Sequence, residues 1–456
     1  MTTGGGRHGA EEDPDFDFDL ERSSGVVEVS MAVEDPDFDL ERAVCSHGLF
    51  MMAPNRWDPT TRTFQRPLRL RCSSSSSSPL FVVVRISHPF PRPSLLRIFV
   101  FGADALSLPH QQSLLAQVRR MLRISEADDR AVREFHKVHR VAKERGFGRV
   151  FRSPSLFEDM VKCILLCNCQ WSRTLSMARA LCELQSELKD GSVVKNLQPR
   201  TPQKKELKRK NSRQEKSKLR LSFVGEEAEA SSTCGTSGNS GDDLHQYPKR
   251  QRFDSSINHK PRQLLGITDA EEILSPLLLP EIGDFPSPEE LAGLDENFLA
   301  RRCALGYRAK RIRSLARAVV EKKIQLDELE ETCDVSDPSS YEQLNEKLSC
   351  LDGFGPFTCA NVLMCMGFYH KIPSDSETIR HLRQFHSQSC ATIRMVDKHV
   401  DDIYGEFAPF QFLAYWSELW NFYEQMFGKT SEMAQSDYQL ITASNMKDQR
   451  MIKRQG

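Results

Sequence analysis

The segment from Leu351 to Leu382 holds the residues whose types and spacing best suit chemistry. Gly353 and Gly355 lie between two stretches of helical periodicity, which predicts a tight turn joining two helices. Glycines in such a turn leave backbone N–H groups open at the start of the second helix, where they can bind a phosphate oxygen. Asp375 follows in the turn IPSDSET, ahead of another helical stretch.

Two interpretations of Asp375 remain open on spacing alone. Its carboxylate could cap the N-terminus of the following helix, as the neighbouring Ser374 could equally do. It could instead face a substrate held beside the glycine turn, where a carboxylate stabilises a developing positive charge and orients water.

The order of these residues resembles the helix-hairpin-helix and Gly-Pro-Asp motif of the base-excision DNA glycosylase superfamily. In that motif a hairpin of the form LPGxGxxTA precedes a turn of the form PxD. The matching residues here are Leu351, Gly353, Gly355 and Thr358 in the hairpin and Pro373 and Asp375 in the turn. The resemblance implies that Gly353 and Gly355 bind a DNA phosphate and that Asp375 is the catalytic carboxylate.

Two further segments resemble the eukaryotic 8-oxoguanine DNA glycosylase branch. The first, NCQWSRTLSMARALC, begins at Asn168, and the second, LGYRAKRIRSLARAVVE, contains Tyr307 and Arg308. The resemblance implies that Asn168 fills the gap left by an extruded nucleotide and that Arg173 contacts the opposite base. It also implies that Tyr307 and Arg308 lie beside the same gap. The likeness covers most of residues 34–190 and 264–425.

The hairpin departs from members of this branch that also cut the DNA backbone. Those members have a lysine two residues after the second glycine, which forms a Schiff base with the sugar. Phe357 occupies that position here, and Lys371 lies beyond the hairpin helix. The sequence GPFT is instead similar to the GPWT hairpin of alkylated-base glycosylases, which have no lyase step. The resemblance therefore predicts a monofunctional enzyme.

A base pocket is expected from aromatic and amide side chains near the end of the helical part. A flipped base needs stacking partners and hydrogen bonds to its edge, and the candidates are Phe357, Gln411, Phe412 and Trp416. The alternative for this aromatic stripe is helix core packing. The glycine through which the branch reads an oxidised purine has no clear equivalent, and His47–Gly48 is the nearest candidate.

No metal or other cofactor is expected, although the hairpin could bind a monovalent cation. The chain has 13 Cys, mostly in apolar stretches, which is typical of buried reduced thiols. Cys163, Cys167 and Cys169 have no second ligand pair at a zinc-like spacing. The cysteine loop of iron–sulfur relatives is also missing after the motif.

The patterns predict an α+β fold, with a small antiparallel β-sheet domain followed by a mostly helical core. Stretches 64–70, 80–86 and 95–102 are rich in β-branched and aromatic residues, which predicts strands. The expected parts are a disordered acidic tail (1–33), the sheet domain (34–125), the helical core in two pieces (126–190 and 263–428, with the helix-hairpin-helix at 341–382), a disordered basic insert (191–262) and a disordered tail (429–456).

The insert concentrates positive charge in a chain whose formal net charge is −1. Residues 195–220 contain 11 Lys and Arg against two Glu. Two runs, Lys204 to Lys210 and Pro248 to Arg252, suit nuclear import or non-specific attraction to DNA, while a solvated linker is the plainer alternative. No apolar stretch is long enough to cross a membrane.

These observations predict a monomeric nuclear DNA N-glycosylase that acts on double-stranded DNA. It would flip out and hydrolyse a damaged base, an oxidised purine such as 8-oxoguanine, and leave an abasic site. An alkylated-purine glycosylase and a glycosylase-like protein that binds DNA without chemistry are the alternatives.

Overall fold

The computed structural model describes residues 26–71, 78–89, 94–191, 282–331, 333–335, 337–388, 393–442 and 445. The expected basic insert, with both of its basic runs, lies outside these residues, as do residues 1–25 and 446–456. The described residues belong to one compact unit, which comprises Met1–Leu197 and Ala270–Gly456. Among the helices described, none is both long and apolar enough to span a bilayer.

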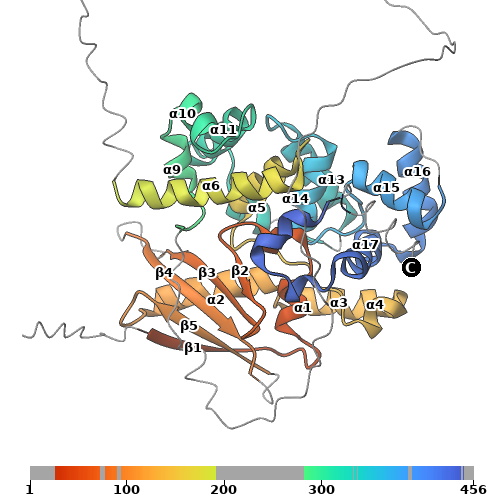
Figure 1. Ribbon diagram of the computed structural model, residues 1–456, viewed down its shortest axis with the longest axis horizontal. Coiled ribbons are helices and arrows are strands. Elements are labelled where there is room, and N and C mark those ends of the chain that lie inside the picture. The colour runs from red at the N-terminus through yellow and green to blue at the C-terminus, as the bar shows by residue number, and fades with distance from the viewer. Residues whose placement is uncertain are drawn as a thin grey trace, which may run out of the picture. The chain divides into compact units, whose positions relative to one another are not determined.

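A five-stranded antiparallel sheet occupies the N-terminal part of the unit (Figure 1). Its order is β1-β5-β4-β3-β2, and the strands are β1 (Val26–Ala32), β2 (Arg56–Asp58), β3 (Thr63–Leu70), β4 (Leu80–Ser87) and β5 (Leu95–Phe101). Val84 pairs with Arg66 on one side and Val100 on the other. The three expected strands and the α+β class are confirmed, because β-branched residues pack well on a pleated surface.

The first strand corrects the expected tail, which was placed at residues 1–33. In β1 the side chains of Val29 and Met31 are buried while Glu28 and Ser30 are exposed, as expected for a half-buried strand. Glu28 also forms an ion pair with Arg97 of β5 at 2.6 Å. This apolar–polar alternation outweighs the low complexity of the residues before it.

The first group of helices lies before the insert. Helix α1 (Leu40–Val44) falls between β1 and β2, and β5 is followed by α2 (Leu108–Leu122), α3 (Glu126–Val138), α4 (Arg140–Glu144), α5 (Leu156–Leu166) and α6 (Trp171–Lys189). Ser107, Ser125 and Ser155 cap α2, α3 and α5 by accepting a backbone N–H bond. Such hydroxyl caps satisfy an otherwise free donor, which is why these helices begin where they do.

The second group continues after the insert: α9 (Pro288–Ala292), α10 (Glu296–Arg302), α11 (Arg308–Val320), α12 (Leu326–Glu331), α13 (Pro338–Ser349), α14 (Pro356–Met366), α15 (Ser376–Phe385), α16 (Ile393–Tyr404) and α17 (Gln411–Phe427). The apolar α14 packs against α5 from the first group. The two pieces of the helical core therefore share one interior.

The sheet is not a separate domain as the sequence suggested. Arg66 of β3 forms ion pairs with Glu158 of α5 at 3.0 Å and with Asp284 at 3.4 Å, and its side chain is fully buried. Lys162, also fully buried, pairs with Glu158 at 2.7 Å. These buried ion pairs connect the sheet to the helices, so the sheet and the helices share a common core.

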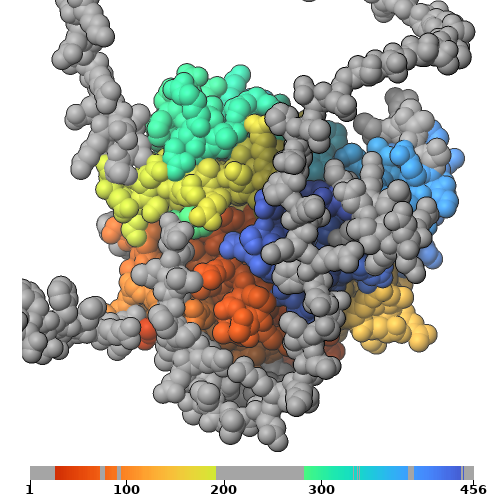
Figure 2. Space-filling view, viewed as in Figure 1, coloured from red at the N-terminus to blue at the C-terminus, as the bar shows by residue number. Residues whose placement is uncertain are grey.

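The C-terminal segment corrects the expected tail at 429–456. Short 3₁₀ turns at Thr430–Glu432 and Gln435–Leu440 fold back on the N-terminal half. Ser431 and Tyr438 accept indole N–H bonds from Trp57 at 2.9 Å and from Trp171 at 3.0 Å. Figure 2 shows this blue surface between the yellow surface of α6 and the orange-red surface of the N-terminal residues.

Candidate active site

The glycine turn joins α13 to α14 as the sequence predicts. Gly353 has φ +91°, and a Cβ there would lie 2.4 Å from the Arg311 Cδ, so only glycine fits. Gly355 is the N-cap of α14, with ordinary backbone angles and open space around it. The amides at the start of α14 are thus presented at a turn with basic Arg311 beside it.

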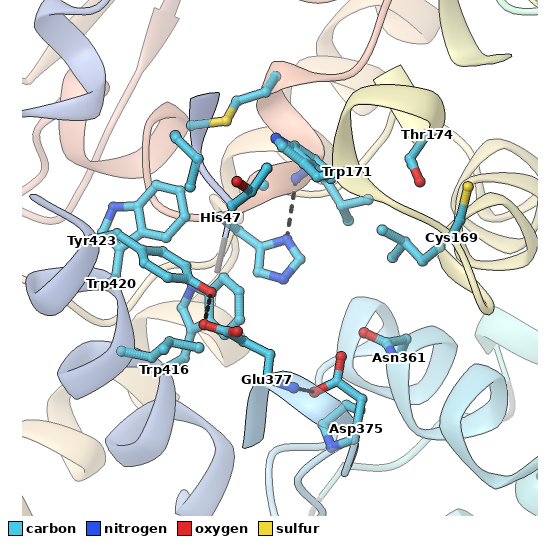
Figure 3. Close-up of a pocket in the computed structure, with 18 of the residues that line it drawn as sticks. His47, Cys169, Trp171, Thr174, Asn361, Asp375, Glu377, Trp416, Trp420 and Tyr423 are labelled. Atoms are coloured by element: carbon cyan, nitrogen blue, oxygen red, sulfur yellow. Dashed lines mark hydrogen bonds between the residues drawn. The ribbon is translucent and has the colours of Figure 1, made fainter. Parts of the chain in front are cut away.

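Asp375 performs the capping role and also faces a cavity. Its Oδ1 accepts hydrogen bonds from the backbone N–H groups of Glu377 at 2.9 Å and Thr378 at 3.0 Å, which begins α15. Within the described part of the chain Oδ2 has no hydrogen-bond partner, and it points into the cavity (Figure 3). The two interpretations left open by the sequence are therefore compatible, because each uses a different oxygen.

The surroundings of Asp375 raise the pKa of its carboxyl. Loss of hydration contributes most, and the negative charge of Glu377 adds to it. Hydrogen bonds from the Thr378 and Glu377 amides oppose the shift without cancelling it. Asp375 is exposed, and the described lining of the cavity that it faces contains no Lys or Arg.

The cavity has a volume of about 520 Å³, within the range of sites that enclose a small molecule. One wall is a ladder of rings on a single face of α17, made by Phe412, Trp416 and Trp420. Successive ring centroids are 5.8 and 5.7 Å apart, in stacked arrangements. The expected Phe357, Phe412 and Trp416 line the cavity, whereas Gln411 does not.

The opposite wall comes from the N-terminal half and was largely missed in the sequence. His47 lies against Trp416 with ring centroids 4.5 Å apart. Burial lowers the pKa of His47 to about 3, with help from the charge of Arg123, so the imidazole is neutral. Its Nδ1 accepts the Leu49 N–H at 3.3 Å, which leaves Nε2 as a donor facing the cavity (Figure 3).

Gly48 and Trp171 complete this wall. A Cβ on Gly48 would lie 3.3 Å from the Cη2 atom of Trp171, so a larger residue would crowd the indole. The indole N–H of Trp171 is committed to Tyr438, and that of Trp416 bonds the Ser46 carbonyl at 2.9 Å. Both indole N–H groups are therefore already hydrogen-bonded within the protein, and the Trp416 ring also stacks with Phe412 and Trp420.

Two polar side chains at the cavity carried no signal that singled them out in the sequence. Asn361 donates through Nδ2 to the Phe357 carbonyl at 2.9 Å, and its side-chain oxygen points toward the cavity (Figure 3). Glu377 accepts from the Tyr423 hydroxyl at 2.6 Å and from Arg380 Nε at 2.8 Å.

The predicted gap residues come together at a loop beside the hairpin. Asn168 is exposed and adopts φ +45°, and its carbonyl accepts a bond from Arg308 at 3.1 Å. Tyr307 is 50% exposed and Arg173 is exposed, so both side chains can meet a ligand. Arg308 is only 2% exposed and also bonds the Cys167 carbonyl, so it braces the loop rather than facing solvent.

No protein-family model and no curated protein matches the chain. Among solved structures it resembles MBOgg1 in complex with a low-affinity DNA ligand, with 16% identity, a TM-score of 0.46 and coverage of 87% of this chain and 97% of that one. It also resembles the 3-methyladenine DNA-glycosylase from Archaeoglobus fulgidus, with 14% identity, a TM-score of 0.49 and coverage of 86% of this chain and 98% of that one. A third match is the 8-oxoguanine glycosylase/lyase of Clostridium acetobutylicum in complex with DNA, with 10% identity, a TM-score of 0.44 and coverage of 84% of this chain and 92% of that one.

The matched structures include DNA glycosylases for both an oxidised and an alkylated purine, as their names state. All three TM-scores are below 0.5.

Proposed function

We propose that this protein is a DNA N-glycosylase that hydrolyses the bond between a damaged base and its deoxyribose. One observation carries the proposal: the free Oδ2 of Asp375 opens into an aromatic-walled cavity beside a turn suited to binding phosphate. A flipped base needs stacking surfaces, and a sugar losing its base needs a nearby negative charge. Both are present in one cavity.

The proposed reaction breaks the C1′–N bond, and its electron pair leaves with the base. Positive charge develops on the sugar, where the Asp375 carboxylate stabilises it. A water oxygen then forms the new bond to C1′, and its proton passes to Asp375. The raised pKa of Asp375 suits this step, because a more basic carboxylate accepts a proton more readily.

The proposed enzyme stops at the abasic site. A lyase step needs an amine near C1′ to form a Schiff base, and the hairpin position that could supply it is Phe357, whose side chain lines the cavity. Lys371 is exposed and is not among the lining residues. Water is therefore the nucleophile that the site accommodates.

Two classes of base are proposed. The segments around Asn168 and Tyr307 favour an oxidised purine such as 8-oxoguanine. The cavity itself favours an alkylated purine that carries positive charge, since Trp171, Trp416 and Trp420 offer cation–π surfaces. Asp375 and Glu377 add negative charge, whereas His47 is neutral.

We further propose that the protein works as a monomer on double-stranded DNA in the nucleus. The runs Lys204 to Lys210 and Pro248 to Arg252 support import, because short basic clusters are what import receptors bind. Exposed Arg173 and Tyr307, beside the hairpin amides, support a DNA-binding face with salt-sensitive affinity.

The decisive experiment is single-turnover base release by wild type and Asp375→Asn, on duplexes carrying oxidised, alkylated or deaminated bases. Asn caps a helix as well as Asp does, so the fold should survive. Base release from the preferred lesion should fall roughly 100- to 10,000-fold, because the charge is lost. Asp295→Asn is the matched control, since Asp295 caps α10 through the Phe298 N–H at 2.9 Å.

A full rate in Asp375→Asn would remove Asp375 from the mechanism. Tight DNA binding by wild type without release from any lesion would support the non-catalytic alternative. Borohydride reduction during turnover provides the last readout, and it should trap no covalent protein–DNA adduct. A trapped adduct would show that an amine attacks the sugar.

A further inference from the structure

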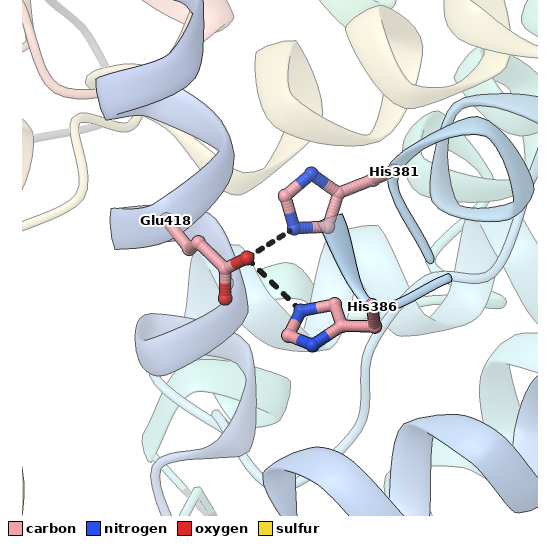
Figure 4. Close-up of side chains that lie close together, drawn as sticks. All are labelled: His381, His386 and Glu418. Atoms are coloured by element: carbon pink, nitrogen blue, oxygen red, sulfur yellow. Dashed lines mark ion pairs between the residues drawn. The ribbon is translucent and has the colours of Figure 1, made fainter. Parts of the chain in front are cut away.

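A second group of side chains, away from the cavity, converges where α15, α16 and α17 meet. His381 lies on α15, His386 directly follows that helix, and Glu418 lies on α17 (Figure 4). The Nε2 atoms of His381 and His386 lie 3.1 and 2.9 Å from the same Glu418 oxygen, Oε1. Tyr404, the last residue of α16, places its hydroxyl 3.2 Å from both nitrogens.

We propose that these residues form a binding site for a divalent transition metal ion of the zinc type. The one ligand atom that each of His381, His386 and Glu418 offers lies within 4.8 Å of the others, the only such group among the described residues. A tetrahedral ion with ligands at 2.0–2.1 Å has ligand–ligand separations of about 3.3 Å. The nitrogen–oxygen separations of 2.9 to 3.2 Å are close to that value.

The chemical types of the ligand atoms indicate which metal ion the site would bind. Two imidazole nitrogens and a carboxylate oxygen are the set that Zn²⁺ and its neighbours bind. Mg²⁺ and Ca²⁺ prefer six or more oxygen ligands, which this group does not supply. The phenol oxygen of Tyr404 or a water would complete four-coordination.

The site is reachable from solvent but closed on one side. The side chains of His386 and Glu418 are 25% and 30% exposed, whereas that of His381 is fully buried. An ion can therefore enter from the His386 side. His381 is held in place by its ring contacts, a stacked one with Phe385 at 4.7 Å and an edge contact with Tyr415 at 5.5 Å.

When Nε2 of a neutral histidine binds a metal ion, its Nδ1 carries the proton. That N–H needs a hydrogen-bond acceptor, and its absence lowers metal affinity. The Nδ1 atom of His381 is buried with no hydrogen-bond partner in the described structure. An unpaired N–H at that position should weaken binding roughly 10- to 100-fold relative to a site with fully paired histidines. The expected site is therefore of moderate affinity.

The bound ion would hold together two helices that form walls of the cavity. Helix α15 begins at Asp375, and α17 carries the Phe412, Trp416 and Trp420 ladder. An ion bound by His381 and Glu418 would fix these two helices against each other. Bound metal should therefore raise the melting temperature, whatever reaction the cavity performs.

The test is titration of the chelator-stripped, reduced full-length protein with Zn²⁺, and with Co²⁺ as a spectroscopic probe. Wild type should bind one Co²⁺ with the absorption of a four-coordinate N/O site and without a sulfur-to-metal band. The affinity of His386→Ala and Glu418→Gln should fall at least roughly 100-fold, because losing a ligand exceeds the cost of losing an outer-sphere contact. Mg²⁺ should not compete.

His399→Ala on α16 is the matched control, because His399 is outside the group. Glu418→Gln keeps the size of the side chain, so it tests the site even if a histidine variant fails to fold. Equal Zn²⁺ affinity and melting shift in wild type and Glu418→Gln would overturn the proposal. So would failure of wild type to bind Co²⁺. Either result would leave Glu418 as a hydrogen-bond acceptor for the two histidines.

Discussion

Asp375 uses its two carboxylate oxygens differently. Its Oδ1 closes the first turn of α15, while Oδ2 faces the cavity. A helix N-terminus also carries partial positive charge, which holds the carboxylate in a fixed orientation. The capping bonds therefore position the oxygen that the proposed reaction uses.

The pKa of Asp375 gives a prediction for the pH dependence of base release. Loss of hydration and the charge of Glu377 raise this pKa, and the proposed reaction uses the carboxylate form. The single-turnover rate should therefore fall as pH drops through a value above the ordinary Asp pKa of about 3.9. A rate that stays constant down to about pH 4 would contradict the prediction, as would the same acid limb in Asp375→Asn.

Among the elements, the α13–α14 hairpin has the most specific sequence requirement. Gly353 must be glycine, because its backbone is left-handed and the Arg311 side chain occupies the space of a Cβ. Gly355 has no such restriction. The two glycines look equivalent in the sequence motif, but in the structure only Gly353 is restricted to glycine by its backbone conformation.

Alanine substitution should separate these two glycines. Gly353→Ala should lower the free energy of unfolding by about 1–3 kcal/mol, since it forces a strained φ and displaces Arg311. Gly355→Ala should change it by no more than about 0.5 kcal/mol. Urea unfolding of both variants provides the measurement. Similar losses in both would show that the hairpin is strained at Gly355 as well.

In helix α17, the helical spacing of the aromatic residues does not reveal their function. Its aromatic residues could be interpreted from the sequence either as core packing or as a base pocket, and the structure places Phe412, Trp416 and Trp420 at the edge of the core. They are largely buried, yet they line the cavity. A spacing of four places them on one face, but only the packing partner shows whether that face meets a core or a cavity.

Across the whole unit, buried charges join the sheet to the helical core. Arg66 is shared by Glu158 and Asp284, and the two carboxyls respond in opposite directions. Burial opposes ionisation of both, but Arg66 and Lys162 outweigh it at Glu158 and lower that pKa to about 2. At Asp284 burial wins and raises the pKa to about 6.

This network predicts a pH-dependent stability that Asp284→Asn should remove. The folded state holds the Asp284 proton more tightly than the unfolded chain does. Its contribution is therefore full below about pH 4 and is lost as pH rises toward 6. Relative to the variant, wild type should lose about 1–3 kcal/mol of unfolding free energy across that interval. Urea unfolding from pH 4 to 7 measures it, and a constant difference would contradict it.

The sequence by itself determined the strands β3 to β5, the hairpin at Gly353 and the placement of Asp375 before α15. Each depends on residues close together in the chain, where alternation, helical spacing and turn chemistry act directly. The edge strand β1 was missed because acidic low-complexity residues precede it. The turns at 430–440 were missed because their partners, Trp57 and Trp171, are distant in sequence.

Only the tertiary structure decided which side chains share a cavity. His47 and Trp171 line the same cavity as α17 from the other half of the chain. The resemblance made His47–Gly48 a candidate, but local spacing could not place either residue opposite α17. The same holds for His381, His386 and Glu418, since the two histidines meet a carboxylate on a different helix. Local spacing governs how a helix forms, but burial of apolar surface between distant segments governs which groups meet.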